Sequence, residues 1–134
     1  MEYVIGTALA LAFTLSATAT GLDRDRAFYT AVAIAVATYY ILFAAMTGSA
    51  SVIIAESVAA GAFLLLAVVG FRTKPSLIAL AIGGHGVFDV LHHLLIDNPG
   101  VPRWWPGFCM SFDVVAGGYL ALVLWKRQTA GSVN

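Results

Sequence analysis

Charged residues are scarce in this chain. Only 10% of its 134 residues are Asp, Glu, Lys or Arg, whereas 60% are hydrophobic. An average soluble domain carries roughly 25% charged residues, so this chain has too few to cover a water-facing surface. Seven basic and seven acidic side chains balance, which leaves no net charge to attract nucleic acid. The composition therefore excludes a soluble domain, gives no support to nucleic-acid binding, and favours an integral membrane protein in contact with the lipid bilayer.

Cysteine and mid-membrane lysine are also scarce. Cys109 is the single cysteine, which excludes an internal disulfide and any metal site built mainly from cysteine. Lys74 and Lys126 fall in a connector and at a helix end, outside the apolar segments. A retinal protein is therefore disfavoured, because it needs a lysine within the membrane for its Schiff base.

Long apolar segments, in contrast, are abundant. A helix needs about 20 apolar residues to cross a hydrocarbon core about 30 Å thick. Five segments meet this requirement, at residues 3–20, 27–46, 51–70, 76–96 and 109–125. We therefore predict an all-α bundle of five transmembrane helices that forms one domain over residues 1–127, followed by a short flexible tail at 128–134. The first segment lacks the basic leader of a signal peptide and is predicted to be a retained helix.

The basic residues predict the orientation of this bundle, because Lys and Arg accumulate in cytoplasmic loops. Alternate connectors lie on the same side of a membrane, so the N-terminus is expected outside and the C-terminus in the cytoplasm. Trp104 and Trp105, among several prolines, then belong to a loop at the outer interface, where indole rings favour the headgroup level. Arg103 is the one basic residue expected outside; the other six are Arg24, Arg26, Arg72, Lys74, Lys126 and Arg127.

Several ionisable residues lie within the predicted helices, where an unpaired charge costs several kcal/mol and usually marks function. The four in the fourth helix fall within an arc of roughly 100° and share one face. With the predicted orientation, the whole set lies in the outer half of the membrane, near the hydroxyls of Tyr39 and Tyr40. The set comprises Glu56, His85, Asp89, His92, His93 and Asp113. We expect these residues to line a polar chamber that opens outward.

Imidazole and carboxylate groups together suit zinc, iron, manganese or copper, whereas calcium sites are built from oxygen alone. The predicted ligands of a divalent transition metal are His85, Asp89, His92, His93 and Asp113. Asp89, His93 and Glu56 are the candidate catalytic acids, bases or carboxylates. The spacing matches neither the His-Glu-x-x-His of zinc proteases nor the Glu-x-x-His pairs of di-iron bundles. The alternative is a structural network in which these groups satisfy one another by hydrogen bonds.

One part of the chain resembles a known family. The run His85-Gly-Val-Phe-Asp89-Val-Leu-His92-His93, followed by Asn98-Pro99, Pro102, Cys109 and Asp113, is similar to the signature of a bacterial membrane family called domain of unknown function 6010. The similarity covers the fourth to the fifth helix, about a third of the chain, and the Arg103-Trp104-Trp105 stretch departs from it. The resemblance implies a shared polar site in a multi-pass protein of the bacterial inner membrane, and it implies no particular reaction.

Three classes of function remain open. The leading hypothesis is a metal-dependent membrane enzyme that acts on a lipid or another apolar substrate. The second is a proton or metal-ion transporter that uses the same residues as a relay. The third is a haem-binding electron carrier, which requires a dimer because all three histidines lie on one helix. Small residues allow close packing of the fourth and fifth helices, and those at 59–61 offer a homodimer contact. The glycines expected at the first contact are Gly83, Gly84, Gly86, Gly117 and Gly118.

Overall fold

The computed structural model describes residues 1–131 and confirms an all-α chain with five helices long and apolar enough to span a membrane. A single 3₁₀ turn, η1 (Leu22–Arg24), follows the first helix. The five helices are α1 (Glu2–Thr20), α2 (Arg26–Thr47), α3 (Ala50–Arg72), α4 (Ser76–Leu95) and α5 (Trp105–Gly131).

The helix boundaries agree with the predicted segments within two residues, except for α5. This helix begins at Trp105, four residues before the predicted segment, because the Trp-Pro-Gly stretch forms its first turn and proline is well tolerated there. It also continues to Gly131, so residues 128–131 are helical where a flexible tail was predicted. The remainder of that predicted tail, 132–134, lies outside the described residues.

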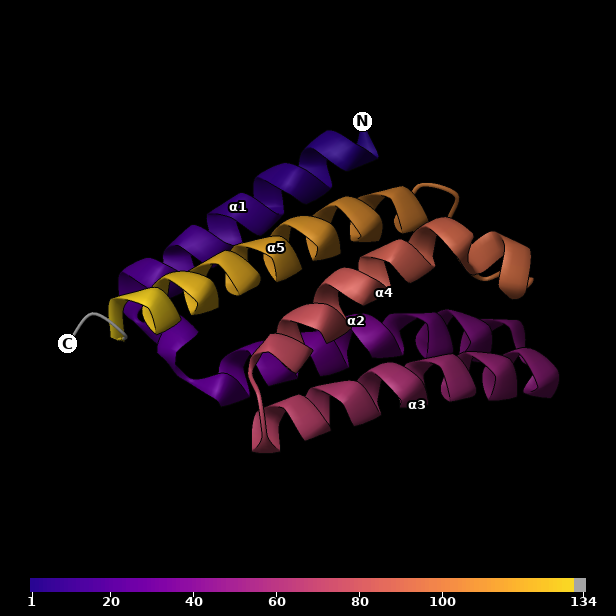
Figure 1. Cartoon of the computed structure of the whole chain (residues 1–134). Helices are drawn as coiled ribbons and strands as arrows, with labels where there is room; N and C mark the ends of the chain where they lie inside the picture. The colour runs from indigo at the N-terminus through magenta and orange to yellow at the C-terminus, as the bar shows by residue number, and fades with distance from the viewer. Residues whose placement is uncertain (132–134) are drawn as a thin grey trace.

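The short connectors have clear physical causes. Gly21 and Gly48 end α1 and α2 with positive φ angles of 80° and 70°, which glycine adopts without the steric cost of a Cβ atom. The Asp25 side chain then caps the start of α2 by accepting a hydrogen bond from the Ala27 amide at 2.8 Å. These turns reverse the direction of the chain, so that α2 runs antiparallel to both α1 and α3 (Figure 1).

Figure 1 shows the order of the helices in space, which differs from their order in the chain. The last helix, α5, lies between α1 and α4, and α4 in turn packs against the hairpin formed by α2 and α3. As a result, α4 and α5 occupy the middle of the bundle. The predicted polar residues of these two helices are therefore placed in its interior.

Small residues allow α4 and α5 to approach closely. A Cβ atom added to Gly117 would lie 2.6 Å from the backbone nitrogen of Gly83, and one added to Gly86 would lie 3.0 Å from the Cβ atom of Asp113. Close approach of this kind is typical of helix pairs in membranes, where packing rather than the hydrophobic effect drives association. Gly84 and Gly118 make no such close contact. The predicted role of glycine is thus confirmed for Gly83, Gly86 and Gly117.

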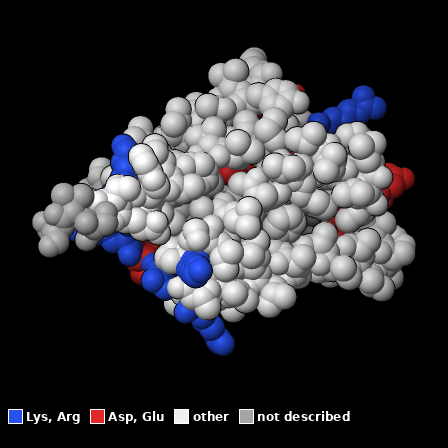
Figure 2. All heavy atoms as spheres, in the orientation of Figure 1, with Lys and Arg blue, Asp and Glu red and all other residues white. Residues whose placement is uncertain are grey.

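The face of the bundle seen in Figure 2 is mostly free of charge, and its Lys and Arg side chains lie toward the two ends. Large hydrophobic side chains such as Leu42, Ile54 and Leu94 are exposed, while the core is built mainly from alanine. Lys and Arg side chains gather at the end of the molecule where the C-terminus lies, which we call the basic end. Arg103 lies in the α4–α5 connector, at the opposite end. Such a surface suits lipid along the sides of the bundle and water at its two ends.

Candidate metal centre and polar site

His85, on the inward face of α4, lies at the centre of the polar interior. Its Nδ1 atom is 2.8 Å from Oδ2 of Asp113 on α5 and 3.7 Å from Oδ2 of Asp89, one helical turn further along α4. All three side chains are at most 2% exposed. We call His85, Asp89 and Asp113 the triad. The close contact of α4 and α5 through glycine is what brings Asp113 within reach of His85.

The triad could hold a metal ion. One ligand atom from each residue can be chosen so that all three atoms lie within 4.8 Å of one another. Oδ2 of Asp89 and Oδ1 of Asp113 are buried and have no hydrogen-bond partner. Because buried polar atoms are nearly always satisfied, two unpartnered carboxylate oxygens beside one imidazole indicate a place for a cation. One nitrogen and several oxygen donors form a ligand set that suits zinc, iron or manganese.

Tyr40 of α2 holds one member of the triad in place. Its hydroxyl donates a 2.7 Å hydrogen bond to Oδ1 of Asp89, and the tyrosine itself is 2% exposed. A carboxylate that is hydrogen-bonded through one oxygen keeps the other free and fixed in orientation, as the second shell of a metal site does for its ligands. Tyr40 was predicted to supply a hydroxyl near the site, whereas the adjacent Tyr39 is 41% exposed and packs on Trp105.

A second polar group lies nearer to the end opposite the basic one. Nε2 of His92 on α4 is 2.8 Å from Oε1 of Glu56 on α3, and the Asn98 side-chain amide donates to the same oxygen at 2.8 Å. All three residues are buried. Glu56, His92 and Asn98, which we call the outer group, therefore pair one carboxylate with one imidazole and one amide. Glu56 faces the interior, as its inclusion among the candidate site residues requires.

The triad and the outer group are connected through Tyr40. Its ring stacks on the His92 imidazole with centroids 3.9 Å apart, and its backbone carbonyl accepts a hydrogen bond from the Asn98 amide at 3.2 Å. Its hydroxyl reaches Asp89, as described above. One residue of α2 thus contacts both groups, and the two form a continuous buried polar site.

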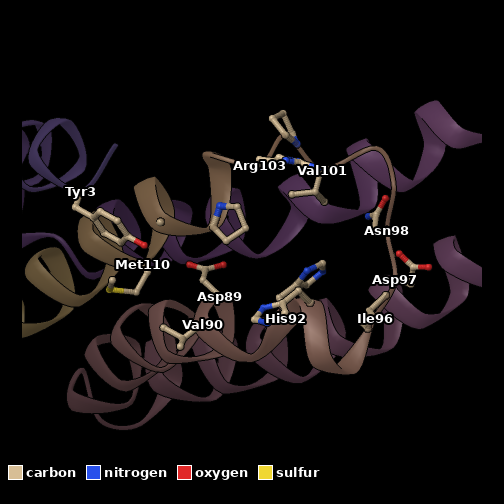
Figure 3. A pocket seen from close by; sticks show the side chains of 14 residues that line it. Tyr3, Asp89, Val90, His92, Ile96, Asp97, Asn98, Val101, Arg103 and Met110 are labelled. Atoms are coloured by element: carbon tan, nitrogen blue, oxygen red, sulfur yellow. The ribbon is translucent and has the colours of Figure 1, made fainter. Parts of the chain in front are cut away.

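A cleft of about 550 Å³ connects this site to the surface. Figure 3 shows Asp89 and His92 at its wall, with Tyr3 of α1 near one end, Asn98 near the other, and Val101 and Arg103 of the α4–α5 connector facing them. His93 also lines the cleft and is exposed. The α4–α5 connector therefore forms one side of an opening that leads from the surface to Asp89.

The structure brings together three of the five predicted metal ligands: His85, Asp89 and Asp113. It places His92 in the outer group with Glu56, and His93 in the cleft. The single shared helix face gave no means of separating His92 from His85, because the distinction depends on which neighbouring helix each one meets. Asn98 was not among the predicted site residues. Its position beside a proline indicated only a turn, and its contact with Glu56 depends on how the connector folds back over α2.

Trp105 also differs from its predicted place in a loop. It begins α5 and packs edge-on against Tyr39 and Phe43 of α2, with ring centroids 5.1 and 4.9 Å apart. Trp104, in contrast, lies in the connector and is 52% exposed. The tryptophan pair thus has one member on the surface and one between helices.

Comparisons of the chain with protein-family models, with curated proteins and with solved structures found no match. The function is therefore argued from the site itself. The resemblance of residues 85–113 to domain of unknown function 6010 stays a prediction.

Proposed function

We propose that this protein is a metal-dependent membrane enzyme that acts on a lipid or another apolar substrate. The observation that carries this proposal is the buried triad, in which two carboxylates face one imidazole and two carboxylate oxygens lack a partner. A structural network needs only enough groups to satisfy one another. An excess of buried carboxylate is expected where a cation is to be bound.

The cleft supports an enzyme because it reaches the triad at Asp89 and is large enough for a small polar group and water. When bound, a divalent metal would polarise a substrate oxygen or activate water. In this proposal His85, Asp89 and Asp113 hold the metal. His93, free at the wall of the cleft, acts as acid or base, and Glu56 fixes His92 beside Tyr40.

A transporter would need a polar path that continues from the triad to the basic end. Instead, Ile78 and Ile82 of α4 pack with Ala116 and Leu120 of α5 in the buried core on that side. Thr14 is buried nearby, but its hydroxyl bonds to the carbonyl of Ala10 within its own helix. Packed apolar residues on this side favour a site that is open from one side only, and hence an enzyme over a transporter.

Metal content is the decisive measurement. Protein purified in detergent without chelator should carry close to one equivalent of zinc, iron, manganese or copper by elemental analysis, and chelation should remove it. The variant His93→Ala should retain the metal, because His93 lies outside the triad. A metal site would be nearly filled under these conditions. A metal content below about a tenth of an equivalent would therefore contradict the proposal and favour a hydrogen-bonded network.

We also infer that the N-terminus lies outside the membrane and the basic end in the cytoplasm. The inference rests on the α1–α2 connector, the α3–α4 connector and the end of α5, which lie at one end of the bundle and carry six of the seven Lys and Arg residues. Reporter fusions after Thr47 and after Lys74 should report opposite sides, with the Lys74 fusion cytoplasmic. Fusions that report the same side would contradict the five-helix topology, and a reversed result would place the cleft in the cytoplasm.

A further inference from the structure

A second hollow reaches the triad from the other side. This groove, of about 290 Å³, lies between α1, α2 and α5 and includes Asp113 in its lining. Its remaining lining is almost entirely apolar or aromatic: Phe13, Val32, Ala35, Val36, Tyr39, Trp105, Phe108, Cys109 and Phe112. The cleft, in contrast, is lined by Asp89 and includes Asp97, Asn98 and Arg103. The triad therefore lies between a polar cleft and an apolar groove.

The groove continues toward the end opposite the basic one. Tyr39, Trp105 and Phe108 line both this groove and a further hollow beside Met1 and Ile5. All of these residues belong to helices that can span a membrane, except Met1, which immediately precedes α1. The medium beside such a groove is hydrocarbon, so the molecules available to fill it are lipid chains.

Two residues that line this apolar groove each carry a buried polar atom without a partner. Oδ1 of Asp113 and Nε1 of Trp105 are both buried and form no hydrogen bond. Apolar packing alone would leave such atoms unsatisfied, which is unfavourable for a buried donor or acceptor. Their presence indicates that the groove receives a molecule with a polar part and does not serve only for packing between helices.

We propose that the substrate is an amphiphile whose hydrocarbon chain occupies the groove and whose polar group lies at the triad, while the cleft supplies water and releases the polar product. This inference rests on the proposed function and adds to it the substrate class and the route of entry. The unbranched acyl chain of a lipid fits a groove that is bordered by aromatic rings. The chain enters sideways from the lipid, through the groove that α1, α2 and α5 border.

Cys109 provides a direct probe of this route, because it is the single cysteine of the chain, is 6% exposed and lines the groove. We expect N-dodecylmaleimide to modify Cys109 in protein reconstituted into phosphatidylcholine vesicles, as measured by intact mass. Ala35→Trp, which places a large ring in the groove, should slow this modification at least about tenfold, since it removes the space for the chain. The matched control is Ala62→Trp on α3, an exposed position that lines neither hollow, and it should leave the rate unchanged.

A second arm links the chain to the triad. Dodecyl hydroxamate, which carries a metal-binding head on a hydrocarbon chain, should protect Cys109 in the metal-loaded protein at least about tenfold better than acetohydroxamate, which lacks the chain. In metal-depleted protein dodecyl hydroxamate should protect Cys109 less well, because only its chain then contributes to binding.

The outcomes separate the two proposals. Equal modification rates in Ala35→Trp and Ala62→Trp would contradict the proposal that a hydrocarbon chain occupies the groove, even if the protein carried one equivalent of metal. Slow modification of Ala35→Trp in a protein without metal would support the groove and contradict the metal enzyme. If modification of the unaltered protein slowed on self-association, as judged by cross-linking, the groove would be an interface between two copies, and the substrate route would be excluded.

Discussion

Two buried acidic sites of this protein differ in how their charge is balanced. At the basic end, Oδ2 of Asp23 accepts hydrogen bonds from the Arg127 guanidinium at 2.7 Å and from the Thr18 hydroxyl at 3.2 Å. One carboxylate there meets one permanent cation, which is itself 42% exposed to solvent. In the triad, two carboxylates meet a single imidazole and no side chain is more than 2% exposed.

Unpartnered atoms alone do not separate these sites, because Oδ1 of Asp23 also lacks a partner. The difference lies in charge and in access to water. Asp23 is neutralised by Arg127, and the pair ties α5 to the α1–α2 connector, so it has a structural role. The triad has two carboxyl groups and one imidazole, and no described Lys or Arg side chain pairs with them. The comparison teaches that a buried ion pair becomes a candidate binding site when its charges do not balance.

Asp113→Asn is expected to have the largest effect on this comparison. It removes one of two carboxylates and leaves the size of the side chain unchanged, so bound metal should fall from near one equivalent to below about a tenth. Arg127→Ala at the balanced site is the control; it should retain full metal, although it should lose about 3 kcal/mol of stability because the buried Asp23 carboxylate then lacks its cation. Elemental analysis of both variants measures the bound metal. Equal metal content in the two would show that charge excess does not define the site.

Glu56→Ala should have the next largest effect, and on stability rather than on metal. It removes the acceptor shared by His92 and Asn98. Nε2 of His92 then has no acceptor and the Asn98 amide keeps only the Tyr40 carbonyl, which should cost about 3 kcal/mol of unfolding free energy. Glu56→Gln retains an acceptor oxygen and should cost less. Unfolding in mixed micelles measures both, and metal content should stay near that of the unaltered protein. Loss of metal in Glu56→Gln would instead show that the outer group takes part in metal binding.

Tyr40→Phe tests the connection between the two groups. The ring can still stack on His92, but Asp89 loses the hydroxyl that fixes its orientation. By analogy with other outer partners of metal ligands, metal affinity should fall about 10–100-fold while the protein stays folded. Competition with a chelator of known affinity provides the measurement. Unchanged affinity would mean that Asp89 is held without Tyr40.

Gly117→Ala should give the smallest change, and it tests how the triad is assembled. Its added methyl group would meet the backbone of Gly83 and push α4 from α5, at a cost of about 1–3 kcal/mol of stability and some metal affinity. Gly118→Ala is a matched control, because nothing lies within 4 Å of its added Cβ atom. Thermal unfolding and metal titration of both variants measure the effect. Identical behaviour would show that the two helices can shift without cost.

Several features of the fold were accessible from the sequence for local reasons. Hydropathy predicted the five helices, because a membrane span depends on the composition of about 20 consecutive residues. The helical period likewise placed His85, Asp89 and His92 on one face of α4, and all three are buried. His93, adjacent in sequence to His92, falls at the edge of that face and is exposed. The start of α5 was missed because tryptophan and proline together resemble an interfacial loop.

The sequence by itself determined that this chain has five segments able to span a membrane and that they carry ionisable residues, since both follow from composition and helical period. Only the tertiary structure decided how those residues divide. His85 meets Asp113 because α5 inserts beside α4, whereas His92, two turns further along the same helix, meets Glu56 because α3 passes at that level. The order of helices in space is set by non-local packing, including the close contact at Gly83 and Gly117. No local pattern encodes that order, so the separation of the triad from the outer group required the structure.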